Sequence, residues 1–152
     1  MKFEQNTALQ EFDRINNSIN EFYHEINLRQ GLSDSAFDVL QAILILGDGC
    51  TQTDIYKYCI LNKQTVNSAV KKLNKDGYIE FTKGSGREIR IHFTPYGESM
   101  VKEKVLPIAQ AESEVFQEMT DEERKEIIRL VDSYLKNFRK KVLAILGNEN
   151  DA

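Results

Sequence analysis

A row of amide and hydroxyl side chains, flanked by ammonium groups, lies between residues 63 and 75 of this chain. The neutral members are Gln64, Thr65, Asn67 and Ser68, and the cationic members are Lys63, Lys71, Lys72 and Lys75. Amide and hydroxyl groups exchange hydrogen bonds with the edges of bases, whereas ammonium groups neutralise phosphates. The residue types therefore indicate contact with a nucleic-acid duplex.

These side chains need a helix to hold them on one side. Val66, Val70 and Leu73 recur at helical spacing and predict a buried face on a helix over 63–75. Asn62 is its expected N-cap, and Gly77 suits the left-handed position after its end. The polar and cationic residues occupy the opposite face.

A shorter helix precedes this one. Thr51 and Asp54 form a capping box at its start, and Ile60-Leu61-Asn62 makes the turn between the two helices. This spacing predicts a helix-turn-helix motif, in which the N-terminal residues of the second helix reach the bases. We therefore expect base contacts from Gln64, Thr65 and Asn67. The later lysines are expected to contact phosphates.

The sequence then changes to a period of two, which predicts a β-hairpin from Tyr78 to Phe93. A glycine-rich loop over 83–86 joins the strands, and Arg87 beside it can enter a narrow minor groove. Ser85 belongs to the same expected DNA contact. Arg90 either contacts DNA as well or pairs with Glu88. A hairpin after a helix-turn-helix predicts a winged helix.

The distribution of charge supports this interpretation. The chain has a net charge of -4, yet residues 51–94 carry eight basic and four acidic side chains. Residues 1–50 carry three basic and eight acidic groups, and residues 95–152 are also acidic overall. Because affinity for DNA depends on the local cations that face phosphates, the negative total does not exclude DNA binding.

Helices are also predicted on both sides of this region. One covers 7–28, one follows the cap Ser33 over 34–46, and one begins at Thr94-Pro95 and is interrupted at Pro107. A last helix follows a capping box at Thr120. The first and last helices carry apolar stripes at Phe12, Ile15, Ile19, Phe22, Val131, Leu135, Phe138 and Val142. These stripes predict a homodimer.

Other classes of function have little support. No apolar run is long enough to span a membrane and no secretory signal is present, so a cytoplasmic protein is expected. His24 and His92 lie on different predicted elements, and no metal-ligand cluster, cofactor motif or catalytic motif occurs. Cys50 and Cys59 are interpreted as buried apolar residues, with a thiol-based oxidant sensor as the alternative.

Three segments carry a resemblance to a known family: LSDSAFDVLQAIL, TQTDIYKYCILNKQTVNSAVKKLNKDGYIEFTK and GREIRIHFTPYGESM. The chain resembles the MarR family of bacterial transcriptional regulators over nearly its whole length. The resemblance implies an obligate dimer, a winged helix in each subunit and a pseudo-palindromic operator. It places Gln64, Thr65, Asn67 and Ser68 in the recognition helix and Arg87 at the wing. Ser85 stands where the family commonly has an aspartate that holds the wing, so that support is expected to be missing.

The resemblance also implies a small-molecule pocket, with Tyr23, His24, Arg29 and Phe37 as candidates and ordinary core or interface packing as the alternative. The expected fold is mainly α with a small β-hairpin wing. Residues 33–94 would form the winged helix-turn-helix, 1–32 and 95–147 a helical dimerisation region, and 148–152 a frayed end. The expected function is that of a dimeric repressor, not an enzyme, released from double-stranded DNA by an effector. A protein-interaction adaptor and a redox-sensing regulator are the alternatives.

Overall fold

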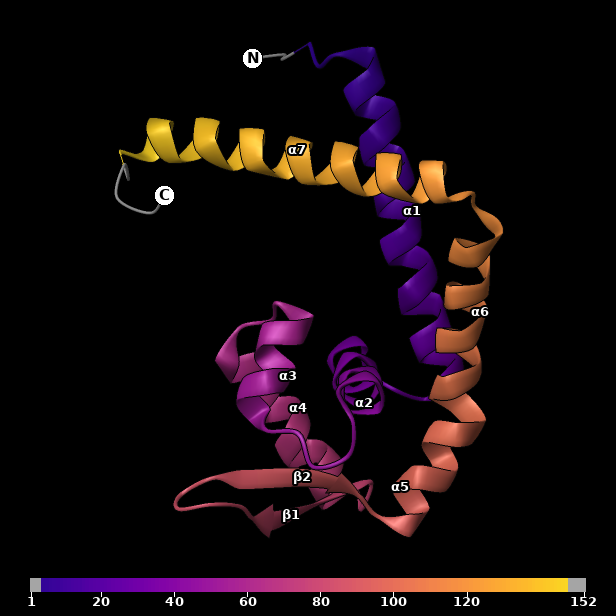
Figure 1. Ribbon diagram of the computed structural model, residues 1–152, viewed down its shortest axis with the longest axis vertical. Coiled ribbons are helices and arrows are strands. Elements are labelled where there is room, and N and C mark those ends of the chain that lie inside the picture. Colours follow the sequence, from indigo (N-terminus) through magenta and orange to yellow (C-terminus); the bar gives the residue numbers. More distant parts are fainter. Residues whose placement is uncertain (1–3, 148–152) are drawn as a thin grey trace. The chain divides into compact units, whose positions relative to one another are not determined.

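The computed structural model describes residues 4–147, so the predicted frayed segment 148–152 lies outside the described residues. The chain forms two compact units, residues 1–109 and 110–152. The first unit contains α1 (Thr7–Gln30), α2 (Asp34–Leu46), α3 (Gln52–Cys59), α4 (Lys63–Lys75), β1 (Ile79–Lys83), β2 (Ile89–Phe93), α5 (Pro95–Met100), a π-helical segment η1 (Val101–Val105) and the start of α6 (Leu106–Glu118) (Figure 1). The second contains the rest of α6 and α7 (Asp121–Leu146).

Local capping determines where the helices begin. The Ser33 hydroxyl accepts a hydrogen bond from the Ala36 N–H at the start of α2. Thr51 and Asp54 form the predicted capping box of α3, and Asn62 caps α4. Each cap satisfies an N–H that has no partner within the helix, which contributes about 1 kcal/mol. The predicted starts of all three helices are confirmed.

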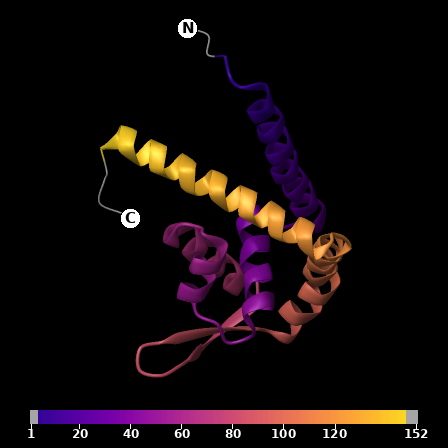
Figure 2. The same cartoon turned by 45° about the horizontal axis from the view of Figure 1, so that its top comes forward.

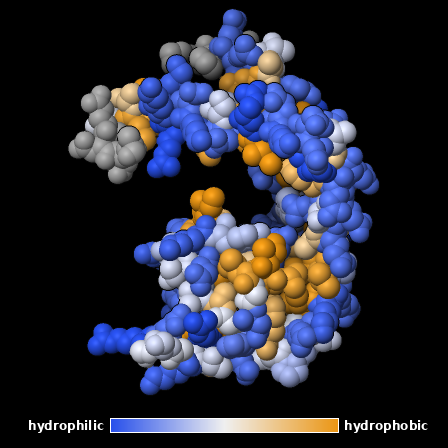
Figure 3. Space-filling model, viewed as in Figure 1, coloured by the Kyte–Doolittle hydropathy of each residue, from blue (hydrophilic) through white to orange (hydrophobic). Residues whose placement is uncertain are grey.

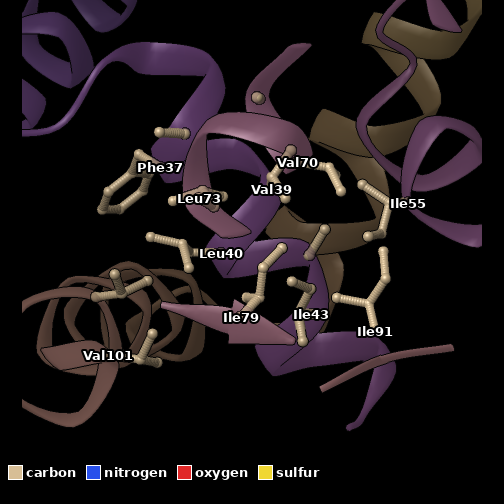
Figure 4. Packing of buried hydrophobic residues seen from close by; sticks show 14 of the residues in the cluster. Phe37, Val39, Leu40, Ile43, Ile55, Val70, Leu73, Ile79, Ile91 and Val101 are labelled. Carbon is tan, nitrogen blue, oxygen red and sulfur yellow. The ribbon is translucent and has the colours of Figure 1, made fainter. Parts of the chain in front are cut away.

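The hydrophobic core lies within the first unit. Helix α2 contributes most to it, with Phe37, Leu40 and Ile43 fully buried (Figure 4). Ile55 of α3 and Leu73 of α4 pack against the same cluster (Figure 4). Because burying one such side chain contributes roughly 1.5–3 kcal/mol, this core holds the two helices of the helix-turn-helix in a fixed relation.

The wing is an antiparallel hairpin in which Ile79 pairs with Phe93 and Lys83 pairs with Ile89. Near the core it is anchored by Ile79 and Ile91, which are both buried. Phe81, which pairs with Ile91, is exposed, and so is Ile89 nearer the loop. The outer end of the hairpin extends away from the helices (Figure 2). The predicted winged helix is confirmed.

The interruption predicted around Pro107 is also present. Proline lacks an N–H and cannot continue an α-helical hydrogen-bond ladder without a break. The break takes the form of the π-helical turn η1, whose end is marked by a hydrogen bond from the Leu106 N–H to the Val101 carbonyl. Beyond it α6 continues as a regular helix.

In the second unit, α7 begins at the capping box of Thr120 and Glu123. Most of its apolar stripe is exposed, with Leu135 at 59% and Phe138 at 54% of full accessibility, whereas Val142 is half-buried. The stripe on α1 in the first unit is exposed in the same way. None of the described helices is long and apolar enough to cross a bilayer.

Candidate nucleic-acid interface

Helix α4 has two chemically distinct faces. Val66, Val70 and Leu73 are buried, as predicted. The outward side carries exposed Lys63, Gln64, Asn67, Ser68, Lys71, Lys72 and Lys75. Thr65 differs from these residues, because it is half-buried and its hydroxyl donates to Asn62 Oδ1 at 3.0 Å. Seven of the eight polar and cationic side chains predicted on this helix are therefore open to an approaching duplex.

A hollow of about 450 Å³ lies between α3 and α4 on this side. We call it the interface groove, and it is lined by Gln52, Thr53, Tyr56, Lys63, Gln64, Val66 and Asn67. The Nζ atom of Lys63 lies 5.1 Å from the centre of the Tyr56 ring, a cation–π distance. Gln52 Nε2 donates to Asn67 Oδ1 at 3.4 Å. The groove thus combines a held cation with several amides.

The α3 members of the interface groove were not predicted from the sequence. Gln52 and Tyr56 are one helical turn apart and share a face of α3 with Thr53. Their spacing of four was the available signal, because it places a polar and an aromatic side chain on the side that meets α4. Within the helix-turn-helix, DNA contacts were expected from the second helix alone.

The tip of the wing presents a second group of polar side chains. Lys83, Ser85 and Arg87 are all exposed, and Gly86 adopts a left-handed conformation with φ of 64°. The Glu88 N–H donates to the Ser85 carbonyl at 3.1 Å and closes the loop. Figure 3 shows a hydrophilic projection where the hairpin ends. The predicted wing residues Ser85 and Arg87 therefore lie together at an accessible tip.

Arg90 is held by the protein itself. Its Nη1 donates to the Gly49 carbonyl at 3.0 Å, and its Nη2 lies 3.2 Å from the Glu88 carboxylate. Gly84 lies close to this ion pair, since a Cβ added there would come within 2.9 Å of Glu88 Oε2. Of the two alternatives for Arg90, this geometry favours the pair with Glu88. The contacts of Arg90 with Glu88 and the Gly49 carbonyl therefore support the wing, a role that was not expected of Ser85.

A second tie joins the wing to the loop between α2 and α3. His92 Nδ1 lies 2.7 Å from the Asp48 carboxylate, and its Nε2 lies 2.8 Å from the Thr82 hydroxyl. The Phe93 N–H donates to the other Asp48 oxygen at 3.0 Å. Burial would raise the pKa of Asp48, but the hydrogen bonds from His92 and Phe93 outweigh it and lower that pKa. The ionised carboxylate therefore stabilises the base of the wing.

The comparisons with known proteins identify the fold. Residues 30–88 match the model of the MarR family. NMB1585, a MarR family regulator from Neisseria meningitidis, is 26% identical, with 91% of this chain and 97% of that chain covered and a TM-score of 0.72. The match over residues 30–88 and the similarity in fold both point to the MarR family. No match is found among curated protein sequences.

Two further solved structures show similarity in the fold alone, because the identities are low. The MepR–DNA complex from Staphylococcus aureus is 17% identical, with 87% of this chain and 96% of that chain covered and a TM-score of 0.69. Bordetella bronchiseptica BpsR, whose DNA binding is regulated by 6-hydroxynicotinic acid, is 19% identical. It matches over 88% of this chain and 97% of that chain, with a TM-score of 0.63.

The four side chains predicted for a MarR-type ligand pocket have different surroundings in the described part of the chain. Arg29 lines a hollow of about 260 Å³ with Phe22, Glu25, Ile26, Gln30 and Ile108, and it is ion-paired with Glu25. The Nδ1 atom of His24 lies 2.9 Å from Oδ2 of Asp34. Phe37 belongs to the hydrophobic core, and Tyr23 is half-buried.

Both thiols lie in surroundings that disfavour the thiolate. Burial raises the pKa of Cys50 to about 11, and burial does the same for Cys59, with Asp38 adding to the effect. At pH 7 such a group is ionised in roughly one molecule in ten thousand. Because the thiolate is the reactive form, these cysteines fit the apolar interpretation better than that of an oxidant sensor.

Proposed function

We propose that this MarR-family protein is a dimeric transcriptional repressor that binds a pseudo-palindromic operator and is released from it by a small molecule. The observation that carries the proposal is the outward face of α4. Amides lie near its N-terminal end, and Lys71, Lys72 and Lys75 follow along the same exposed side. The order of these groups matches the order in which a recognition helix meets bases and then phosphates.

Each winged helix would place α4 in a major groove and the tip of the wing in the flanking minor groove. Gln64 and Asn67 would contact base edges, with Ser68 beside them. The wing tip would bring Arg87 to the minor groove, where the negative potential is concentrated. MepR of Staphylococcus aureus is a MarR-fold protein with a DNA complex, which supports this arrangement for the present chain.

The dimer is supported by apolar surface that a single chain leaves uncovered. Phe12, Ile15, Ile19 and Phe22 are exposed along one stripe of α1, and Phe22 reaches 61% accessibility. Val131, Leu135 and Phe138 are exposed along α7. Contiguous exposed apolar stripes of this kind mark interaction surfaces. We assign them, with Val142, to a helical dimerisation region over 1–32 and 95–147, and residues 33–94 to DNA binding.

An effector would act by preferring one spacing of the two recognition helices, because a ligand shifts an equilibrium only through its differential affinity for the two states. Two hollows in the first unit are candidate sites. One is the Arg29 hollow described above, and the other, of about 360 Å³, lies between α2 and η1 beside Leu44, Phe93 and Leu106. Figure 3 shows hydrophobic surface over α2 and α5 in this region. The 6-hydroxynicotinic acid that regulates BpsR supports an effector of small-molecule size.

The test is fluorescence anisotropy of the purified protein with fragments of its source genome at two salt concentrations. Selective binding of one fragment by a dimer, with affinity that falls steeply as salt rises, is the expected result. If no fragment changed the anisotropy at low salt, DNA binding would be refuted and the adaptor alternative favoured. An adaptor would not need lysines along the exposed face of α4. The expected site of action is the cytoplasm, and no enzymatic role is proposed.

A further inference from the structure

Two side-chain amides from different helices meet in the interface groove. Gln52 is the first residue of α3, and Asn67 lies on the exposed side of α4, fifteen positions later. The Nε2 atom of Gln52 donates a hydrogen bond to Oδ1 of Asn67 at 3.4 Å. Both residues line the same hollow on the side of the motif that carries the predicted base contacts. The two amides are therefore placed to act together.

The hydrogen bond fixes which groups each amide can offer. Asn67 directs its carbonyl oxygen at Gln52, so its Nδ2 group remains available as a donor. Within the described part of the chain, Gln52 Oε1 accepts no hydrogen bond and remains available as an acceptor. The pair thus presents one donor and one acceptor, contributed by two helices.

We propose that Gln52 and Asn67 form a composite amide pair that selects adenine over guanine at one base pair of each half-site. The inference rests on the DNA binding proposed above and adds Gln52 of α3 as a residue that determines specificity. In the major groove adenine presents the N7 acceptor and the N6 donor, whereas guanine presents the acceptors N7 and O6. Asn67 Nδ2 matches N7 of either base. Gln52 Oε1 matches only the adenine N6 donor and opposes the lone pairs of guanine O6.

The other polar members of the groove have different roles. The ammonium group of Lys63 is held over the Tyr56 ring, where it attracts phosphate without distinguishing bases. Gln64 is not hydrogen-bonded to Gln52, among the described contacts, and provides an independent base contact. If Gln52 served only as the first residue of helix α3, its replacement would change the affinity for every DNA sequence equally. A Gln52 in the composite pair influences one base pair selectively.

The experiment measures dissociation constants for a set of duplexes in which each base pair of the selected operator is replaced in turn. The variants are Gln52→Met, which keeps the length of the side chain and removes the amide, Asn67→Ala, and the double substitution. Gln110→Met on α6 is the matched control. Wild-type protein should prefer adenine over guanine at one position of each half-site. Gln52→Met should reduce that preference about tenfold and leave the other positions unchanged.

The double substitution should lose no more adenine preference than Asn67→Ala, because Gln52 acts with Asn67. Melting temperatures check folding, and Gln52→Leu, which also lacks the amide, should lose the preference if Gln52→Met is unfolded. The composite pair would be overturned if both Gln52 variants kept the adenine preference, or if they lost affinity equally at all positions. It would also be overturned if the losses of adenine preference from the two single substitutions added up in the double substitution. None of these results would contradict DNA binding. Wild-type protein that binds no duplex would overturn both.

Discussion

Replacing Arg87 by glutamine removes one positive charge from the tip of each wing and keeps a hydrogen-bonding side chain there. Arg87 is exposed and, among the described contacts, has no ion-pair partner. A dimer would bring two such side chains to two phosphate-lined minor grooves. Because each phosphate contact contributes about 0.9 to the dependence of log K on log salt, the slope should become less steep by about 1.8. Between 50 and 200 mM salt, the affinity of the variant should fall about twelvefold less than that of wild type.

Arg90→Gln is the matched control. Arg90 lies only three positions away, but its guanidinium group is held by Glu88 and the Gly49 carbonyl. Its replacement should lower the melting temperature through loss of these contacts and leave the salt slope nearly unchanged. Fluorescence anisotropy titrations at five or more salt concentrations measure both slopes. An unchanged slope in Arg87→Gln would refute the wing contact. An equal change in Arg90→Gln would show that Arg90 leaves its partners and binds DNA, as the other sequence-based alternative held.

Three further outcomes are expected. Ile19→Asp combined with Leu135→Asp should give a monomer that binds no operator, and a dimer mass in light scattering would place the interface elsewhere. Leu73→Ala should lower the free energy of unfolding in urea by about 2–5 kcal/mol, because it opens a cavity beneath α4; a loss below 1 kcal/mol would contradict this burial. The lowered pKa of Asp48 implies stability that is present above the unfolded pKa of 3.8 and lost as pH falls through the folded value. The stability difference between wild type and Asp48→Asn should therefore shrink from pH 6 to pH 3, and a constant difference would contradict the wing tie.

The elements that could be predicted are those specified by local sequence. The capping box of Thr51 and Asp54, the cap Asn62 and the apolar spacing on α4 each involve residues within one or two turns. Such local preferences do not depend on tertiary contacts, so they can be predicted from the sequence. The interruption at Pro107 was predictable for the same reason, although its π-helical form was not.

The features that could not be predicted depend on contacts between residues far apart in the chain. Arg90 reaches the Gly49 carbonyl across 41 positions, and Gln52 reaches Asn67 across fifteen. Periodicity also cannot separate a core residue from one that lines a pocket. The resemblance made Phe37 a ligand candidate, with core packing as the alternative, and Phe37 lies in the hydrophobic core.

The loop between α2 and α3 is joined to β2 at several points. Cys50 and Ile91 form a β-bridge, Gly49 donates to the Ile91 carbonyl, and Asp48 accepts from the Phe93 N–H. Bending the hairpin against the helices would break all of these bonds at once. The hairpin and the helix-turn-helix should therefore rotate as one rigid body, with the hinge outside residues 48–93. Any change in the distance between two α4 helices would then be accompanied by a matching displacement of the two hairpin tips.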